Sequence, residues 1–189
     1  MERLEELKRE MQRAFEQSPF REQGPLVWGD GLDTSPRVML IGEAPGAQEV
    51  QQGRPFVGKA GKNLDVFLQA VGLDRREIYT SNVVKIRPSR RSAAGNLVNR
   101  PPSTGEKEWF TPWLLREMEL VTPRLLVTLG NVALQALTQA TIGEVHGELI
   151  RENRAGIPLF PLYHPASVIY NPALKEIYFR DLEALARIV

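Results

Sequence analysis

The chain has 189 residues, of which 42% are hydrophobic and 25% are charged, and its formal net charge is +1 at pH 7, all ordinary values for a globular protein that buries a core. It contains no cysteine, which excludes disulfides, thiolate metal sites and a cysteine nucleophile. No apolar run approaches the roughly 20 residues that cross a bilayer, and the first residues lack the apolar region of a secretory signal, so we expect a cytoplasmic protein without membrane contacts.

The first predicted element is a helix. Apolar residues recur at helical spacing in residues 2–17, and a loop rich in glycine and proline follows over residues 18–36. Four short apolar runs begin at Arg37 and predict strands. They read RVMLIG, IYTSNVV, RLLVTLG and IPLFPLY.

Helical patterns alternate with these runs. They lie around residues 59–71, 106–120 and 130–139 and in a final segment near residues 174–185, and a hairpin is considered around residues 148–158. Short apolar strands alternating with helices indicate a parallel sheet covered on both faces. We therefore expect one α/β domain over residues 1–189, a three-layer α/β/α sandwich with a central, mainly parallel four-stranded sheet. Residues 1–36 are expected to pack on it.

Polar residues stand at the carboxyl ends of the expected strands, where open parallel sheets place their sites. They are Gly42 and Glu43, Ser81 and Asn82, Gly130 and Asn131, and His164 and Pro165. Taken alone, His164 is as well explained by a structural role, Asn82 by a hydrogen bond at a strand end, and Phe56 by the core. The loop after Gly42 lacks the glycine spacing of phosphate-binding and dinucleotide-binding loops, so nucleotide binding is disfavoured.

Residues 85–100 carry five basic residues and no acidic one. Charge alone favours a solvated loop, and the alternative is a segment that contacts phosphate groups. Residues 88–105 are rich in proline, serine, arginine and asparagine, and we expect them to form a loop.

Read together, five motifs resemble family 4 of the uracil-DNA glycosylase superfamily. They are GEAPG at 42–46, GRPFVGKAG at 53–61, YTSNVVKIRP at 79–88, LVTLGNVAL at 126–134 and YHPAS at 163–167. The resemblance spans about residues 37–185. It implies a monomeric enzyme that flips uracil out of DNA and hydrolyses its N-glycosidic bond. The product would be an abasic site for base-excision repair, and no cofactor would take part in the chemistry.

The resemblance also implies roles for the residues of the base pocket. The flipped uracil would stack on Phe56, and the Asn82 amide would pair with its O4 and N3–H, a pattern that cytosine reverses. His164 would stabilise the departing uracil anion at O2. Glu49 would obstruct the methyl group of thymine.

The remaining pocket residues lie at the start of the same loop. Gly42 and Ala44 would line the base site, and the Ala44 N–H would assist at the uracil anion. Glu43 would order a water molecule or support the loop, and together with Glu49 it is not interpreted as a two-carboxylate glycosidase pair.

Contacts with DNA are expected from two further segments. Lys85, Arg87, Arg90 and Arg91 would contact phosphates, as would Ser167. Val168 and Ile169 would fill the gap left by the extruded base, or else they would open a buried helix.

The chain departs from family 4 at the cysteines that usually hold a four-iron, four-sulfur cluster. Ile86 and Phe110 stand at two of those positions, so we expect no cluster, no metal and no other cofactor. Apolar packing of Ile86, Trp109 and Phe110 with Met11 or Phe15 would replace it as a small satellite core.

Two alternatives remain open at this point. One is a glycosylase for hypoxanthine or xanthine, and the other is a DNA-binding relative without turnover. The presence of Phe56, Asn82 and His164 favours catalysis. One relative with a family 4 motif traps itself covalently on the abasic product through a histidine of its basic loop, and residues 85–100 of this chain contain no histidine, which disfavours that mechanism.

Overall fold

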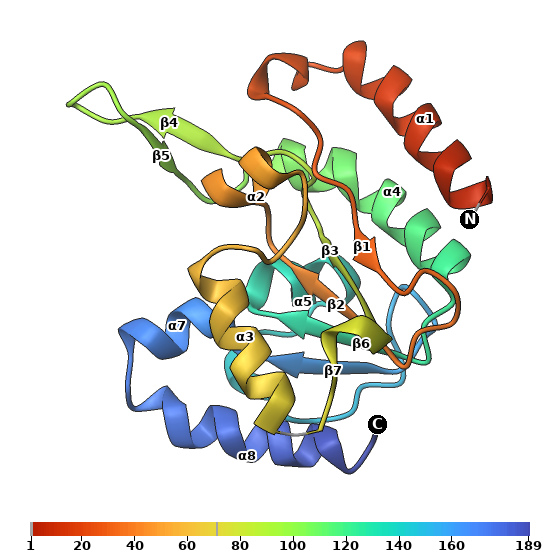
Figure 1. Ribbon diagram of the computed structural model, residues 1–189, viewed down its shortest axis with the longest axis vertical. Coiled ribbons are helices and arrows are strands. Elements are labelled where there is room, and N and C mark those ends of the chain that lie inside the picture. Colours follow the sequence, from red (N-terminus) through yellow and green to blue (C-terminus); the bar gives the residue numbers. More distant parts are fainter. Residues whose placement is uncertain (1, 71) are drawn as a thin grey trace.

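A sheet lies at the centre of the molecule (Figure 1), and the computed structural model describes residues 2–70 and 72–189. Its strands are β1 (Asp30–Gly31), β2 (Val38–Gly42), β3 (Ile78–Asn82), β6 (Leu125–Leu129) and β7 (Leu159–Leu162). They follow the order β1-β3-β2-β6-β7, and all run parallel except β1, which is antiparallel to β3. The predicted α/β fold with a mainly parallel sheet is confirmed, but the sheet has five strands and not four.

The strand that the sequence did not reveal is β1, which pairs Asp30 with Thr80 and Gly31 with Tyr79. Two residues, one of them a glycine, give no apolar run that would indicate a strand. Gly31 has φ 119°, and a Cβ there would overlap the carbonyl oxygen of Ile78. The edge strand therefore depends on a glycine and not on side-chain burial.

Helices cover both faces of the sheet (Figure 1). On one face lie α1 (Glu2–Glu16), α4 (Thr104–Val121), α5 (Asn131–Leu137) and α6 (Ile142–Val145), and on the other α3 (Lys59–Ala70), α7 (Pro165–Tyr170) and α8 (Leu174–Ala186). Strand β2 feeds both cores, because successive side chains point to opposite faces: Met39 and Ile41 enter the first, and Val38 and Leu40 the second. None of the described helices combines the length and apolar character that a membrane span requires.

Several short elements lie outside the predicted pattern. They are α2 (Ala47–Gln52), the 3-10 turns η1 (Arg21–Gln23) and η2 (Arg75–Glu77), α6, α7, and the strands β4 (Ser89–Arg91) and β5 (Leu97–Asn99). Residues 88–105, expected to form a loop, thus include an antiparallel hairpin. An antiparallel bridge between Ile150 and Leu159 lies where a hairpin was considered. Residue 71 and the side chains of residues 60, 63, 66, 67, 70, 169 and 170 lie outside the described part.

The apolar residues expected to form a satellite core do pack together. Phe15 of α1 meets Trp109 and Phe110 of α4, with ring centroids 6.0 and 6.3 Å apart. Met11 and Ile86 are buried in the same cluster. The cluster is continuous with the core on this face of the sheet, so it is not a separate satellite.

Candidate active site

The carboxyl edge of the sheet brings three predicted pocket residues together. Gly42 and Asn82 are aligned in the parallel register of β2 and β3, and Phe56 reaches the same point from the loop after α2. A Cβ at Gly42 would overlap Asn82 Oδ1 and would lie 2.6 Å from Phe56 Cζ. Asn82 and Phe56 are only 5% and 6% exposed. Glycine at position 42 is therefore what lets the amide and the ring close on the strand end.

Phe56 has a backbone conformation that non-glycine residues rarely adopt, with φ 54°. Arg75 holds it, because its Nη2 donates to the carbonyl oxygens of Pro55 and Phe56 at 3.0 and 2.7 Å, while its Nη1 pairs with Asp65 at 2.9 Å. Gly61 allows the close approach, since a Cβ there would overlap the Phe56 carbonyl. Such strain persists where the surrounding structure imposes it, and here it orients the ring.

Glu49 fastens the loop that carries the pocket. Its carboxylate accepts the backbone N–H of Gly46 at 3.1 Å and that of Gly58 at 2.8 Å. Glu49 stands in the first turn of α2, where a carboxylate also meets the positive end of the helix dipole. Because both oxygens are engaged, the side chain is a fixed wall, which suits a steric role better than that of a base.

Glu43 and Ala44 follow β2 and are both partly buried. The Glu43 carbonyl accepts the N–H of Val84 at 3.0 Å, which extends the pairing of β2 and β3. Burial raises the pKa of the Glu43 carboxyl, and the charge of Lys107 on α4 opposes that rise. The surroundings of Glu43 thus raise the proton affinity of its carboxyl group.

His164 caps the first turn of α7. Its Nδ1 accepts the N–H of Ala166 at 3.1 Å, so the proton of the neutral ring lies on Nε2. Burial lowers the pKa of the imidazole below its usual 6.5. Gly130, after β6, fits against it, because a Cβ there would lie 3.3 Å from His164 Cβ. The result is a neutral ring that offers one N–H donor at pH 7.

Lys85 does not lie on the surface, which corrects the expectation that it contacts DNA phosphate. It is 1% exposed and pairs with Glu117 of α4 at 2.5 Å. Its Nζ also donates to the Ser81 hydroxyl and, at 2.9 Å, to the carbonyl of Asn82. Glu117 in turn accepts from Tyr79 and Ser81, each at 2.8 Å. The lysine therefore supports the strand end that carries Asn82.

The family described as the Uracil DNA glycosylase superfamily matches residues 29–184. The chain belongs to the uracil-DNA glycosylase superfamily. The type-4 uracil-DNA glycosylase of Archaeoglobus fulgidus is 33% identical over 196 aligned residues, which cover 100% of this chain and 94% of that protein. The type-4 uracil-DNA glycosylase of Thermotoga maritima is 35% identical over 164 residues, 84% of this chain and 80% of that protein. The predicted resemblance to family 4 is thereby confirmed.

A further relative shows the same unit inside a longer protein. A DNA polymerase of Bacillus phage SP01 is 31% identical over 155 residues, which cover 81% of this chain but 16% of the polymerase.

The other residues expected to contact DNA differ in exposure, and Arg87 is partly buried. Arg90 and Arg91 are exposed on β4, and Ser167 is exposed on α7. Val168 is 7% exposed and belongs to the core between α3, α7 and α8, so it follows the buried-helix alternative and not the wedge. The side chain of Ile169 lies outside the described part of the structure.

The iron–sulfur cluster usual in family 4 does not fit the residues present. Such a cluster needs thiolate ligands, and the chain has no cysteine. Ile86 and Phe110, at two of the family's cysteine positions, are both 0% exposed in an apolar cluster. Among the described residues, no group of three or more histidine and carboxylate side chains is placed to hold a metal. We assign no step to a cluster or a metal.

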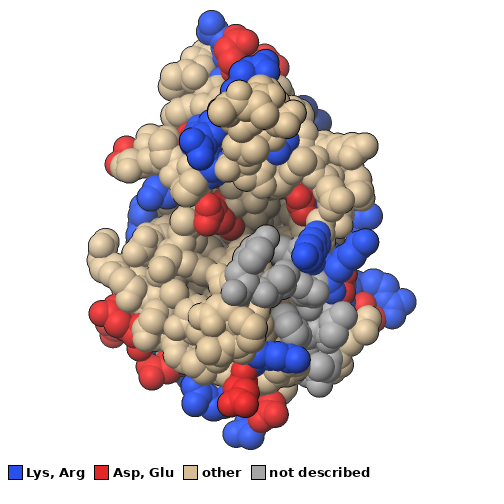
Figure 2. Space-filling view, turned by 90° about the vertical axis from the view of Figure 1, so that its left-hand side faces the viewer, with Lys and Arg blue, Asp and Glu red and all other residues tan. Residues whose placement is uncertain are grey.

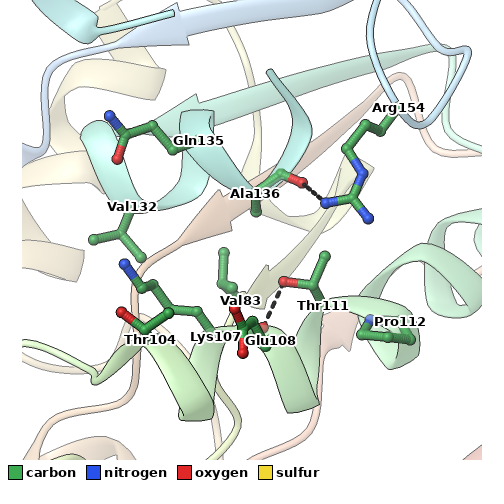
Figure 3. A pocket seen from close by; sticks show the side chains of 10 residues that line it. All are labelled: Val83, Thr104, Lys107, Glu108, Thr111, Pro112, Val132, Gln135, Ala136 and Arg154. Carbon is green, nitrogen blue, oxygen red and sulfur yellow. Dashed lines mark hydrogen bonds between the residues drawn. The ribbon is translucent and has the colours of Figure 1, made fainter. Parts of the chain in front are cut away.

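A separate cavity of about 250 Å³ opens between α4 and α5 (Figure 3). Lys107 and Thr111 line it from α4, and Arg154 approaches from another segment and donates to the Ala136 carbonyl at 3.1 Å. Val83, which follows Asn82, forms part of its wall. None of the predicted base-binding residues lines this cavity. Lys107, which does line it, interacts electrostatically with Glu43.

Three supporting residues escaped the sequence analysis. Arg75 and Lys107 lie outside the quoted motifs, and nothing in their local pattern indicates a role at the site. Glu117 had a weak signal. Its partner Lys85 stands inside the apolar run VVKI, and a charge within such a run is rarely buried unless it is paired.

Proposed function

We propose that this protein hydrolyses the N-glycosidic bond of uracil in DNA and leaves an abasic site for base-excision repair, acting as a monomer. The observation that carries the proposal is the convergence of Phe56 and Asn82 on Gly42. It places one aromatic ring and one amide together at the carboxyl end of β2. The target base must leave the duplex to reach such a site.

Selection of uracil follows from the amide of Asn82 and from the fixed carboxylate of Glu49. Asn82 offers one donor and one acceptor, which match O4 and N3–H of uracil, whereas cytosine would leave both unpaired. Glu49 is pinned by Gly46 and Gly58, so it does not yield to the additional methyl group of thymine.

Bond cleavage places negative charge on uracil, and His164 is prepared for it. The Ala166 N–H occupies Nδ1, so the Nε2–H is the donor available to uracil O2, with the Ala44 N–H as a second donor. A neutral donor needs no proton transfer before the bond breaks. Glu43 orders the water that attacks the sugar carbon. Burial raises the pKa of its carboxyl, and the nearby charge of Lys107 opposes that rise.

The test is excision from an oligonucleotide with a single uracil, followed by alkali to cut abasic sites. Cleavage at uracil alone, with none at thymine, is the expected result. Asn82→Ala should lose at least about 100-fold in rate, because both hydrogen bonds to the base edge disappear. Cleavage only at hypoxanthine or xanthine would replace the substrate, and no cleavage of any of these would leave a DNA-binding protein without turnover.

A further inference from the structure

The β4–β5 hairpin projects from the body of the molecule (Figure 1) and carries the most exposed large hydrophobic side chain of the described residues. Leu97 is 56% exposed, against 43% for Leu32 and for Ile188. No acidic residue occurs between Lys85 and Arg100, so the apolar side chain stands in a basic setting. An exposed leucine alone needs no explanation, but its place on a basic arm does.

The base of this hairpin is fastened. Arg100 forms a two-pronged pair with Glu106 at 2.6 and 2.8 Å, and Glu106 is 0% exposed. Although burial opposes it, hydrogen bonds from Arg100 and Ser103 hold the pKa of Glu106 at about 2. Arg100 also donates to the Ser89 carbonyl at 3.3 Å, across the two strands. The arm is therefore held in one direction.

The base of the hairpin lies beside the loop that carries the candidate pocket residues. Asn99 of β5 reaches the pocket loop, where its Nδ2 lies 3.6 Å from a Cβ placed on Gly46, the residue whose N–H binds Glu49. Arg87 orders this strand by donating to Asn99 Oδ1 at 2.7 Å and to the Leu97 carbonyl at 3.3 Å. Alternate residues of a strand share a face, so Leu97 lies on the same face of the hairpin as Asn99.

The two arginines of β4 lie on opposite faces of the hairpin, and Arg91 shares the face of Leu97. Arg91 pairs with Leu97 across the hairpin, and Arg90 pairs with Val98. Figure 2 shows the side of the molecule toward which the hairpin points: its middle is hollowed, and Lys and Arg side chains lie on the part above the hollow. This side therefore carries cations above a hollow that has Asp and Glu side chains at its rim.

We propose that Leu97 inserts into the base stack of duplex DNA beside the extruded uracil, while Arg90 and Arg91 contact the flanking phosphates. The proposal rests on the proposed function and assigns a wedge to the hairpin, whereas Val168 of α7 is buried. Apolar side chains that enter a base step unstack it and fill the gap that remains. Single-stranded DNA stacks only loosely and has no opposite strand that leaves a gap, so we expect the hairpin leucine to matter mainly for duplex substrates.

The experiment compares Leu97→Ala with Leu32→Ala, an equally large change at another exposed leucine. Leu32 donates its N–H to the carbonyl of Ile78, at the amino end of β3 and hence at the opposite edge of the sheet. Uracil excision is measured on one oligonucleotide, both single-stranded and in a duplex. Leu97→Ala should lower kcat/KM on the duplex about ten-fold or more and on the single strand less than about two-fold. Leu32→Ala should change neither, and Leu97→Met should restore most of the duplex activity.

A second readout does not need turnover. A duplex with 2-aminopurine beside a 2′-fluorinated deoxyuridine, which resists cleavage, brightens when the stack opens. Wild type and Leu32→Ala should give this signal, and Leu97→Ala should lose it. Equal effects of Leu97→Ala on duplex and single strand, or an unchanged fluorescence signal, would overturn the wedge. If wild type excises no uracil from either substrate, the proposed function fails, and the fluorescence signal still decides the insertion.

Discussion

The contribution of the buried pair of Lys85 and Glu117 to stability can be measured by replacing the two residues singly and together. Their side chains are 2% and 5% exposed, and the lysine also binds the carbonyl of Asn82. Removing one member of a buried pair leaves an uncompensated charge, which costs about 3–5 kcal/mol. We therefore expect Lys85→Met and Glu117→Leu each to lower the free energy of unfolding by about that amount.

The double replacement Lys85→Met/Glu117→Leu removes both charges and should recover part of this loss. It still leaves the hydroxyl groups of Tyr79 and Ser81 without their carboxylate, at about 1–3 kcal/mol each. We expect a total destabilisation well below the sum of the two single replacements. Urea unfolding of the four proteins of the cycle measures this coupling, with equal m-values as the check on two-state unfolding.

Activity should not recover with stability, because the Asn82 carbonyl has lost its ammonium donor in the double variant. A small displacement of a positioning group can cost about 100-fold in rate. Single-turnover excision of uracil, under conditions where the double variant is folded, measures this loss. The single-turnover rate constant of the variant should fall, while its affinity for DNA changes little. Wild-type excision by a folded double variant would refute the positioning role, and additive destabilisation would refute the coupling.

Other predictions concern the glycine, the histidine and the apolar cluster. Gly42→Ala should cost about 1–3 kcal/mol and most of the activity, because its Cβ would overlap Asn82 and crowd Phe56, whereas the matched change Gly143→Ala meets no atom within 4 Å and should affect neither. Because burial lowers the pKa of His164, the excision rate should stay constant down to about pH 6.5 and fall in more acidic solution. Protonation would place a hydrogen on Nδ1, which would then oppose the Ala166 N–H instead of accepting from it. The free energy of unfolding should also decrease as the pH falls from about 6.5 through the lowered pKa of His164. An excision rate that rises on acidification would contradict the role proposed for His164. Phe110→Ala should lower stability by about 3–5 kcal/mol, and an iron chelator should leave the Tm and the excision rate of wild type unchanged.

The sequence predicted the parts of the fold that depend on continuous burial. Each run that became β2, β3, β6 or β7 is apolar because both faces of the sheet are covered, and parallel strands then place Gly42, Asn82, Gly130 and His164 at one edge. Elements without a buried face gave no such pattern. The β4–β5 hairpin has an exposed, basic surface and reads as a loop, although Arg100 and the buried Glu106 hold it.

Lys85 shows why side-chain roles could not be read with the same success. A lysine beside arginines resembles a phosphate contact, and its true partner Glu117 is 32 residues away on α4. Only the packing of α4 against β3 reveals the pairing. Val168 raises the same problem, because an apolar residue shortly after His164, the proposed catalytic histidine, suits a wedge and a core equally well. Long-range burial, which local patterns do not encode, decides both cases.

The residues at the family's cluster positions adjoin the network that supports Asn82. Ile86 follows Lys85 directly, and Phe110 lies two turns before Glu117 on the same face of α4. Both are 0% exposed, and Gly29 brings the backbone of the N-terminal loop so close that a Cβ there would overlap the Tyr79 hydroxyl and Glu117. The apolar packing of α1 and α4 therefore keeps water away from a buried ion pair, which strengthens the hydrogen bond from Lys85 to the Asn82 carbonyl. The apolar packing at the family's cluster positions thus bears on Asn82, the residue proposed to read the base, through the pair of Lys85 and Glu117.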